Sequence, residues 1–580
     1  MNTSKAIQSG QRVLYTGVLS LFLLLGTSGI TSAQLPTTDL QNAAQGQANP
    51  ARIQSELLER DLLRPTGPKI EVKDLVLQDM PANAEKIRFN LSQIQFEGVG
   101  AYKEADIRHL YADKLGASVT LADIYALATA MTNKYRNDGY ILTQVIVPPQ
   151  TIDGGVVTLR AVEGFVDQIR VSGQDQESAL KTVRAYANRI RGEGALNVED
   201  LEKFLLLIND LPGVSARSIL SPSRTQTGAS DLQIIVERDP FDAFLGIDNY
   251  GSRYLGPLQI SAAGAINSHF GMNERISAQI VVVPDSAELY FISLGYEQPF
   301  GTAGTIFKAL FSHSNTEPGF DLDQFDVNGV SDFYSVSLEH PFIRSRERSL
   351  YGHVSFDWRD VDSRNILEPT REDRIRAVRG GGRLEFLDTL FTAGVNTINV
   401  EVAQGLDILG ASSQNDIRLS RPAGDPEFTK LTAEAQRLQR ITSSVNLLIG
   451  ARGQLANAAL MSSEEFGVGG INSGRGFDPS EIVGDDGVSG KLELQWNEPS
   501  PIRYLEDYQL FGFYDIGKVW NDDATIADND ESLSSAGFGM RAELPADTNA
   551  SLAVAFPLTR DVQTQRDDDA KVYFSLNRAF

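Results

Sequence analysis

The chain has 580 residues, no cysteine and a formal net charge of -24 at pH 7. Its length exceeds the size at which one hydrophobic core usually stops growing, which predicts at least two structural units unless one is a large barrel. The missing cysteines exclude disulfides, thiolate catalysis and most structural zinc sites. The acidic balance argues against a nucleic-acid partner, because a protein that binds phosphates should be basic.

Residues 1–33 have the order typical of a secretory signal peptide. Lys5 and Arg12 precede an apolar run over 13–25, and small residues ending in Ala33 follow. We expect cleavage after Ala33. A membrane anchor is the alternative, but the run is short for a bilayer span, which takes about 20 apolar residues.

Residues 34–85 are predicted to form a leader, a short amphipathic helix and a linker. Residues 34 to about 49 are rich in Gln, Ala and Thr without periodicity, which indicates disorder. Residues 51–64, ARIQSELLERDLLR, place their apolar side chains on one helical stripe, and Pro65 ends the helix. An isolated helix of this length is marginal in water, so we expect it to dock elsewhere.

Residues 86–238 are predicted to contain two copies of one α+β module, over 86–163 and 164–238. Each copy has a strand before a glycine (IQFEG, IRVSG), two helical segments and two further strands. Thr120 and Asp123 form a capping box at the best-marked helix. Each sheet is expected to leave a strand edge open. That edge could bind an extended segment of another chain, or the module could be a scaffold whose edge is tolerated.

Residues 239–580 are predicted to form a transmembrane antiparallel β-barrel of about 16 strands. Apolar and polar residues alternate with a period of two, and the connections are of two kinds, short with Pro or Gly and long with polar or acidic residues. These features are typical of outer-membrane barrels with short periplasmic turns and longer external loops. At roughly 20 residues per strand and connection, the segment accommodates about 16 strands.

Motifs for catalysis, cofactors or metals are missing from the sequence. It has no G-x-S-x-G elbow, and the glycine-rich stretch at 467–476 lacks the Gly-Lys-Ser/Thr of a phosphate loop. The five histidines lie far apart, and the aspartate clusters at 321–326 and 522–530 miss the EF-hand spacing. We therefore predict no enzyme activity, no cofactor and no metal site.

The segment INSGRGFDPSEIVGDDG holds a single cation, Arg475, between two glycines. Inside a barrel this guanidinium should pair with a carboxylate, because an unpaired charge away from bulk water is costly. Asp515, in FGFYDIGKVW, is the candidate partner. Strict alternation puts Asp515 on the face of Phe511 and Phe513, which are expected to point outward. A bulge near Gly512 would then be needed to turn it inward; a surface arginine in a glycine turn is the alternative.

The double module, NYGSRYLG at 249–256, SGRGFDPSEIVGDDG and FYDIGKVW together resemble the outer-membrane transporters of two-partner secretion, the hemolysin and filamentous-haemagglutinin exporter family. The likeness covers nearly the whole mature chain. It implies that the modules are periplasmic POTRA domains, that the helix at 51–64 can plug the barrel, and that a loop arginine meets an aspartate on the barrel wall, here Asp515. The family's Val-Arg-Gly-Phe/Tyr motif corresponds to Gly474, Arg475, Gly476 and Phe477. Glycine replaces the valine, which loosens one packing position.

The resemblance further implies that the POTRA domains capture an unfolded client and that 139–164 belongs to the first of them. The residues expected to contact the client are Phe96, Tyr135, Gly139, Tyr140, Val145 and Val147. We predict a single barrel that exports one large partner exoprotein to the cell surface, while the Arg475 loop organises the lumen.

Three alternatives remain at this point. An outer-membrane assembly factor of the same superfamily would share the loop and the wall aspartate, but should carry more POTRA units and no plug. A passive porin would lack the modules over 86–238. An enzyme facing the periplasm would need a catalytic constellation that the sequence does not contain.

Overall fold

The structure is a computed structural model. It describes residues 47–59, 70–72, 81, 83–173, 177–191, 195–223, 225–226, 228–285, 287–366, 370–500, 502, 504–522 and 530–580. The expected signal peptide, most of the leader, residues 60–64 of the expected helix and most of the linker lie outside these residues. Within them, helices long and apolar enough to cross a membrane are absent.

The first module is a three-stranded sheet with helices packed on it. Its elements are η1 (Ala84–Lys86), β2 (Arg88–Asn90), β3 (Gln93–Glu97), α4 (Glu104–Ile107), η2 (Arg108–Leu110), η3 (Ala112–Lys114), β4 (Ser118–Thr120), α5 (Leu121–Asn137), β5 (Gln144–Ile146) and β6 (Val156–Val162). The sheet order is β3-β6-β5, so β3 and β5 form its edges. The predicted capping box of Thr120 and Asp123 starts α5, and the buried face of α5 covers the sheet.

The second module keeps the order strand, helix, helix, strand, strand, has no described counterparts of β2 and β4, and gains one strand from the linker. Its elements are β7 (Phe165–Gly173), α6 (Glu177–Ala187), α7 (Val198–Asn209), β8 (Val214–Pro222) and β9 (Ala229–Arg238). The linker contributes β1 (Ile70–Val72), which pairs in parallel with β8 and extends the sheet to the order β1-β8-β9-β7. An edge expected to be open is therefore covered by the chain itself, through main-chain hydrogen bonding.

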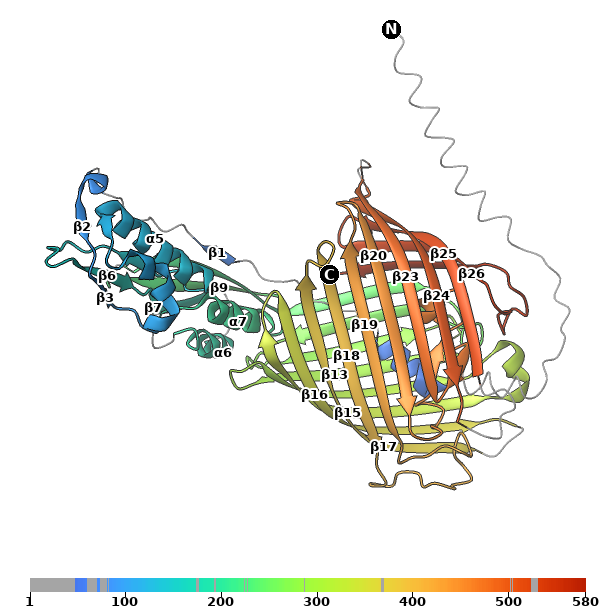
Figure 1. Cartoon of the computed structure of the whole chain (residues 1–580). Coiled ribbons are helices and arrows are strands. Elements are labelled where there is room, and N and C mark those ends of the chain that lie inside the picture. The colour runs from blue at the N-terminus through green and yellow to red at the C-terminus, as the bar shows by residue number, and fades with distance from the viewer. Residues whose placement is uncertain are drawn as a thin grey trace, which may run out of the picture. The chain divides into compact units, whose positions relative to one another are not determined.

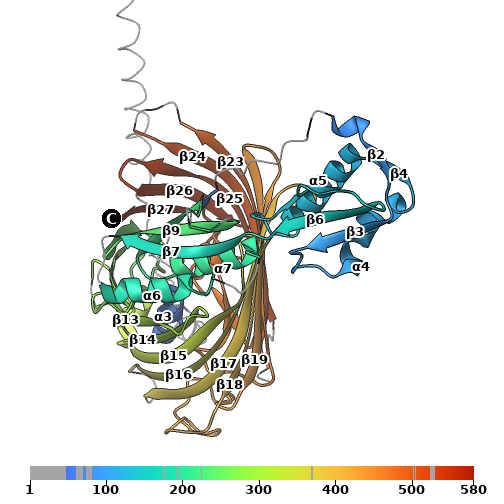
Figure 2. The same cartoon turned by 90° about the vertical axis from the view of Figure 1, so that its left-hand side faces the viewer.

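The remaining chain forms a closed antiparallel barrel (Figures 1 and 2). In the residues that the structure describes it has 16 strands, in agreement with the prediction. They are β10 (Phe241–Asp248), β11 (Gln259–Asn267), β12 (Arg275–Val282), β13 (Leu289–Phe300), β14 (Thr305–Thr316), β15 (Asn328–Arg344), β16 (Arg348–Arg364), β17 (Arg371–Asp388), β18 (Gly394–Gly405), β19 (Thr429–Arg440), β20 (Val445–Ala456), β23 (Asp486–Pro499), β24 (Asp507–Trp520), β25 (Asp530–Leu544), β26 (Thr548–Pro557) and β27 (Lys571–Ala579). Pairing of β10 with β27 closes the ring.

The two faces of the barrel wall differ in chemistry. Leu294, Val336 and Ile516 are exposed on the outer face, as expected for side chains that contact lipid, whereas Ser293 and Ser331 are buried on the inner face. Along each strand the two sets alternate, because successive side chains point to opposite faces. The wall thus surrounds a polar lumen.

Two parts of the chain lie within this lumen. One is the loop between β20 and β23, which contains three short elements: β21 (Phe466–Val468), α8 (Gly470–Ser473) and β22 (Ile482–Gly484). The other is α3 (Pro50–Leu58), which packs against β14 and β15 (Figure 2). Asn49 starts α3 by accepting hydrogen bonds from the main-chain N–H groups of Ala51 and Arg52. A further short helix, η4 (Phe320–Phe325), lies between β14 and β15.

Candidate functional site in the barrel lumen

The predicted arginine motif lies in residues 457–485, which we call the lumen loop. Pairing of β21 with β22 forms the stem of this loop, and α8 lies between the two strands. Gly469 and Gly470 have φ angles of 133° and 75°, in the region that residues with a side chain rarely adopt. The resulting turn brings Arg475 to the inner face of β24.

Arg475 forms a two-pronged ion pair with Asp515. Its Nε donates to Oδ2 at 2.9 Å, its Nη2 donates to Oδ1 at 2.8 Å, and its main-chain N–H donates to Oδ2 at 3.0 Å. The two residues are 5% and 1% exposed. Fixed fork geometry suits arginine to this pairing, which lysine could not reproduce. The structure thus brings together the two residues that the sequence analysis singled out.

The expected bulge near Gly512 is wrong. The ladder of β24 with β23 runs without a register shift over its described length, and Phe511, Phe513 and Asp515 share the buried inner face. Tyr514, which lies between Phe513 and Asp515, is exposed on the outer face. The phenylalanines tolerate the lumen because guanidinium groups cover them: Arg475 lies 3.5 Å from the ring centre of Phe513.

Glu493 on β23 is a second partner of Arg475 that the sequence analysis missed. Its Oε2 accepts a hydrogen bond from Arg475 Nη1 at 2.5 Å. Arg541 on β25 binds the same carboxylate, with Nη1 at 2.7 Å from Oε1, and lies 3.9 Å from the ring centre of Phe511. Two arginines over two rings therefore share one carboxylate. The available signal was the alternation in KLELQW, which places Glu493 on one face with Lys491 and Gln495.

These contacts keep Arg475 charged. Burial alone would lower the pKa of Arg475, but the hydrogen bonds and negative charges of Asp515 and Glu493 raise it above its ordinary value. Removing one partner from such a buried pair typically costs about 3–5 kcal/mol, because the other charge is left uncompensated. The Arg475 cluster is therefore a strong local restraint on the lumen loop.

The other motif residues support the position of Arg475. At Gly476 a Cβ would lie 2.7 Å from Ser535 Cβ and 2.8 Å from the main-chain nitrogen of Pro557, so only glycine fits there. At Gly474, where a side chain would contact Leu533, the backbone is extended and the constraint is weaker. Phe477 is fully buried in a cluster with Val468, Ile482 and neighbouring wall residues.

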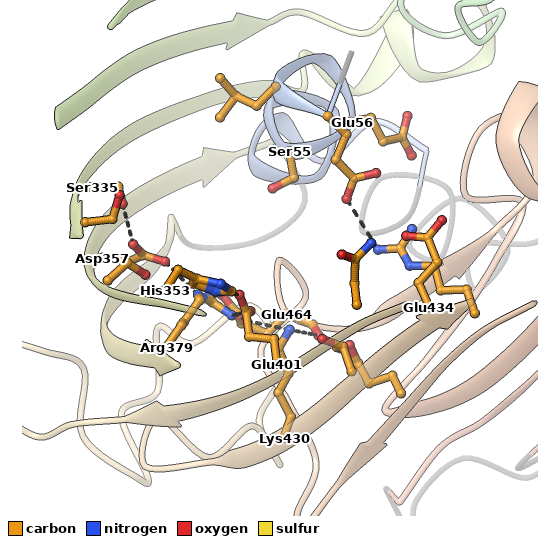
Figure 3. Close-up of a pocket in the computed structure, with 18 of the residues that line it drawn as sticks. Ser55, Glu56, Ser335, His353, Asp357, Arg379, Glu401, Lys430, Glu434 and Glu464 are labelled. Carbon is orange, nitrogen blue, oxygen red and sulfur yellow. Dashed lines mark hydrogen bonds and ion pairs between the residues drawn. The ribbon is translucent and has the colours of Figure 1, made fainter. Parts of the chain in front are cut away.

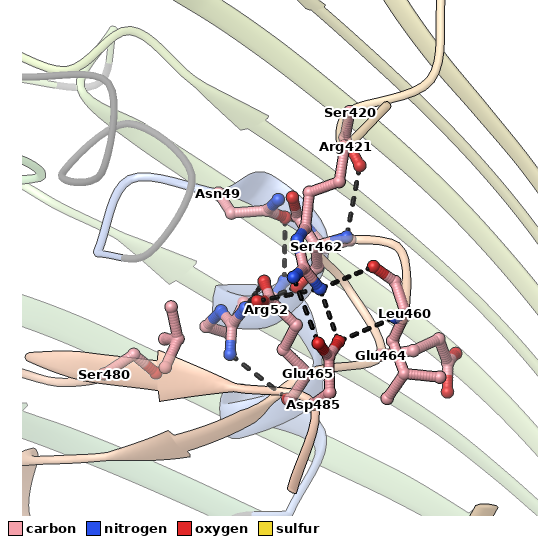
Figure 4. A network of polar contacts seen from close by, with 12 residues as sticks. Asn49, Arg52, Ser420, Arg421, Leu460, Ser462, Glu464, Glu465, Ser480 and Asp485 are labelled. Atoms are coloured by element: carbon pink, nitrogen blue, oxygen red, sulfur yellow. Dashed lines mark hydrogen bonds and ion pairs between the residues drawn. The ribbon is translucent and has the colours of Figure 1, made fainter. Parts of the chain in front are cut away.

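Arg52 connects α3 to the lumen loop. Its guanidinium donates to the carbonyl oxygens of Ser462 and Glu465 and pairs with the Glu465 carboxylate at 3.2 Å. Arg421, from the loop between β18 and β19, lies 3.1 Å from the same carboxylate and also pairs with Asp485 (Figure 4). Burial raises the pKa of Glu465, and the two arginines oppose this shift.

A cavity of about 690 Å³ lies between α3 and the barrel wall. Charged side chains dominate its lining, and most of them are paired (Figure 3). Arg379 binds Asp357 at 2.6 Å and Glu464 at 2.8 Å, and Lys430 binds Glu464 at 2.6 Å. With α3 in place, the lumen is thus partly filled and still contains polar space.

Three of the residues expected to contact the client are in the core of the first module. The side chains of Tyr135, Val145 and Val147 are buried, and the Tyr135 hydroxyl donates to Glu163 at 2.8 Å. Their side chains hold α5 against the sheet.

The other three lie at the periphery of the module. Phe96 on β3 is partly exposed, with its ring centre 5.3 Å from that of Tyr111, and Tyr140 is partly exposed beside Tyr135. The carbonyl oxygen of Gly139 accepts a hydrogen bond from the main-chain N–H of Val198 at 2.8 Å, which places it at the junction with the second module.

A closed barrel with an apolar outer wall, a loop and a helix in its lumen, and two α+β modules ahead of it defines a class of outer-membrane protein transporters. Comparison with known proteins identifies the family within this class. The model of the haemolysin secretion/activation protein family ShlB/FhaC/HecB matches residues 228–542, and that of the ShlB-type POTRA domain matches residues 89–164. The chain belongs to the ShlB/FhaC/HecB family.

Full-length relatives agree with this assignment. The heme/hemopexin transporter protein HuxB of Haemophilus influenzae (strain 86-028NP) is 23% identical over 557 residues, covering 93% of this chain and 96% of HuxB. The outer membrane transporter CdiB of Dickeya dadantii (strain 3937) is 25% identical over 530 residues, covering 88% and 90%. The structure of CdiB from Escherichia coli is similar in fold, with a TM-score of 0.72, 22% identity and coverage of 95% of this chain and all of that one.

The family assignment confirms the predicted fold class, location and transport function. The protein is an outer-membrane transporter of two-partner secretion, with its POTRA domains in the periplasm.

Proposed function

We propose that this transporter exports one large exoprotein through its lumen as a single barrel, without catalysing a covalent step. The POTRA domains capture the unfolded client, α3 leaves the lumen, and the lumen loop stays attached to the wall through Arg475. Folding of the client outside the cell would supply the free energy, since the sequence has no nucleotide-binding motif.

The observation that carries this proposal is the difference in how the two lumen segments are held. Arg475 is buried between two wall carboxylates. In contrast, the hydrogen bonds and ion pairs seen between α3 and the rest of the barrel, among the described residues, each involve at least one side chain, and the buried ion pair of Arg52 with Glu465 stands out among them. A segment held in this way can leave and return without breaking the barrel ladder.

We propose that capture takes place at β3 of the first POTRA domain. A cavity of about 550 Å³ lies beside this edge strand and is lined by apolar and aromatic side chains that include Ile94, Phe96 and Tyr111. An added strand would gain main-chain hydrogen bonds from β3 and side-chain contacts from this cavity. The edge at β8 is already covered by β1. In this proposal Tyr135, Val145 and Val147 support the edge from the core, and Tyr140 and Gly139 border it.

Comparison of secreted proteins tests the proposed function. The culture supernatant and cell surface of the native host would be analysed by mass spectrometry, with the gene for this chain intact, deleted or restored. We expect deletion to remove one large polypeptide, and restoration to return it. Identical protein sets would contradict export. A general loss of outer-membrane barrels would instead favour the assembly-factor alternative.

A further inference from the structure

We propose that the lumen wall beneath α3, on β14, β15 and β16, is a binding site for the main chain of an extended polypeptide, and that α3 occupies this site in the resting state. The inference rests on the proposed function, because it names where the client contacts the lumen. It is carried by a buried arginine without a carboxylate partner and by a row of buried serine hydroxyls.

Arg359 on β16 is the central residue of this site. It is 6% exposed, and its Nη1 donates to the main-chain carbonyl oxygen of Ala51 at 2.8 Å. Its Nη2 donates to Ser55 Oγ at 3.1 Å. Among the described residues its Nε has no hydrogen-bond partner, and the nearby carboxylates of Glu464 and Asp357 act on it by charge without a hydrogen bond. Its guanidinium lies 4.6 Å from the ring centre of Phe333 on β15, but its hydrogen bonds go to groups of a removable helix, one of which is already a peptide carbonyl.

Other buried arginines of the lumen are satisfied differently. Arg379, Arg421 and Arg475 each bind at least one carboxylate of the wall or of a loop. A buried cation without such a partner is costly unless some other group compensates it. When α3 leaves, Arg359 is the lumen arginine that most needs new acceptors, and the carbonyl oxygens of a passing chain supply them.

Serine hydroxyls continue this surface along β14 and β15. Ser312 and Ser314 are fully buried, and their hydroxyls lack hydrogen-bond partners among the residues that the structure describes. Ser331 Oγ donates to the Gln54 side chain at 2.9 Å, and Gln54 returns a bond to the Ser331 carbonyl at 3.2 Å. The fit of α3 to the wall is thus incomplete, since a helix has already paired most of its own main-chain groups.

An extended chain matches the same surface better than a helix does. Every residue of an unfolded segment carries a free N–H and a free C=O, and a serine hydroxyl can pair with either. Arg359 can pair only with acceptors. The small serine side chains leave room for a passing chain. Ser335, whose hydroxyl donates to Asp357 at 2.7 Å, lies further along the cavity beside α3 and can still accept a hydrogen bond (Figure 3). Such a surface recognises main chain and is largely indifferent to client sequence.

The test separates a role in binding the client from a role in holding α3. It uses a chain lacking residues 50–59, which contribute no strand to the barrel. Into this background Arg359→Gln, or Ser312→Val together with Ser314→Val and Ser331→Val, is introduced. Ser489→Val is the matched control, because Ser489 is also buried on the inner wall but lies on β23. Heat-modifiable migration in gels verifies that each barrel is folded.

Two measurements then decide the matter. The polypeptide whose secretion is lost when the gene for this chain is deleted serves as the client. Its secretion should fall several-fold in the Arg359 and triple serine variants and remain unchanged in the Ser489→Val control. In planar bilayers, a neutral unstructured peptide rich in Gly, Ser and Asn should block the pore for several-fold shorter times in the same variants. Equal blocking times would overturn the proposal. Shorter times for an acidic peptide alone would also overturn it, since they would identify Arg359 as a carboxylate site.

The bilayer measurement does not depend on the client. If deletion of the gene removed no secreted polypeptide, the proposed function would fail while the peptide result could still support a main-chain site. If secretion depended on the gene but neither variant changed secretion or blocking time, only the further inference would fail.

Discussion

Each of the two segments inside the lumen carries a buried arginine, and the surroundings of these two arginines differ. Arg475 on the lumen loop is enclosed by Asp515, Glu493 and the ring of Phe513, all from the wall. Arg52 on α3 contacts loop carbonyls and the Glu465 carboxylate, which it shares with Arg421. The wall thus holds the lumen loop through buried ion pairs, whereas its contacts with α3 on β15 and β16 are hydrogen bonds to Arg359 and Ser331. The buried ion pair of α3, that of Arg52 with Glu465, is made with the lumen loop.

Exchange of the loop arginine should have the largest effect. Arg475→Ala leaves Asp515 and Glu493 buried without their shared cation, at a cost of roughly 3–5 kcal/mol. We expect the barrel to insert and secretion of the client to fall by roughly tenfold or more, because the lumen loop loses its buried ion pairs with β23 and β24. Surface levels of the client, compared by immunoblot or mass spectrometry, measure this.

Arg475→Lys provides the matched control for geometry. Lysine keeps the charge but cannot form the two-pronged pair, so secretion should stay well below that of the native chain. Full secretion in the alanine variant, with the barrel still heat-modifiable, would mean that the loop has no role in transport and that the contrast with α3 is without consequence.

Removal of α3 should have the next largest effect. We expect it to change the conductance of the pore and to leave assembly of the barrel unaffected. Deletion of residues 51–64 takes away all of α3 except Pro50, and α3 partly fills the lumen next to a cavity of about 690 Å³. Single-channel conductance in planar bilayers should rise several-fold, while the gel migration of the barrel stays native. Currents equal to those of the intact chain would argue that α3 does not block the pore.

Features of this fold that depend on residues close together in the sequence can be predicted from it, whereas those that depend on residues far apart in the sequence cannot. Alternation with a period of two is a local pattern, so it identifies the barrel from sequence alone. It cannot tell which face is the outer one, and for this reason Phe511 and Phe513 were placed in lipid. Their inward position depends on Arg475 and Arg541, which arrive from other segments.

Ion pairs in the lumen between residues far apart in the sequence cannot be predicted for the same reason. Arg475 stood out because it is the lone cation of a glycine-rich segment, and Asp515 because a strand motif accompanied it. The pair of Arg52 and Glu465 spans 413 residues of sequence, and neither residue differs locally from the many other charges of the chain. Only the fold brings them together.

A weaker effect is expected from Arg52 alone. Arg52→Ala removes charge-assisted hydrogen bonds worth roughly 1.5–3 kcal/mol each, while α3 keeps its contacts with Arg359. Open events in bilayer recordings should become about tenfold more frequent. Arg452→Ala is the control, because Arg452 pairs with Glu59 at 3.4 Å where both side chains are exposed, and such pairs contribute little. Equal opening rates in the two variants would remove the special role of the buried pair.

The smallest expected effect concerns pH. Burial, and then the negative charge of Asp478, raise the pKa of Glu481 in the lumen loop to about 7. Glu481 accepts hydrogen bonds from Gln47 at 3.0 Å and from the main chain of Gln563 at 2.6 Å. Because the folded state binds this proton more tightly than the unfolded state does, the stability that Glu481 contributes is complete below its unfolded pKa. It is lost as the pH rises through 7.

Thermal conversion of the folded gel band to the unfolded one measures this contribution. Between pH 5 and pH 7 the free energy of unfolding should fall by at most about 1.4 kcal/mol per pH unit from this group. Glu481→Gln, which cannot ionise, should flatten the profile over that range and leave secretion near the native level. An unchanged profile in the glutamine variant would show that Glu481 is ionised throughout. The ion pairs of Arg475 with Glu493 and Asp515 would then hold the lumen loop against β23 and β24 without a contribution from the titration of Glu481.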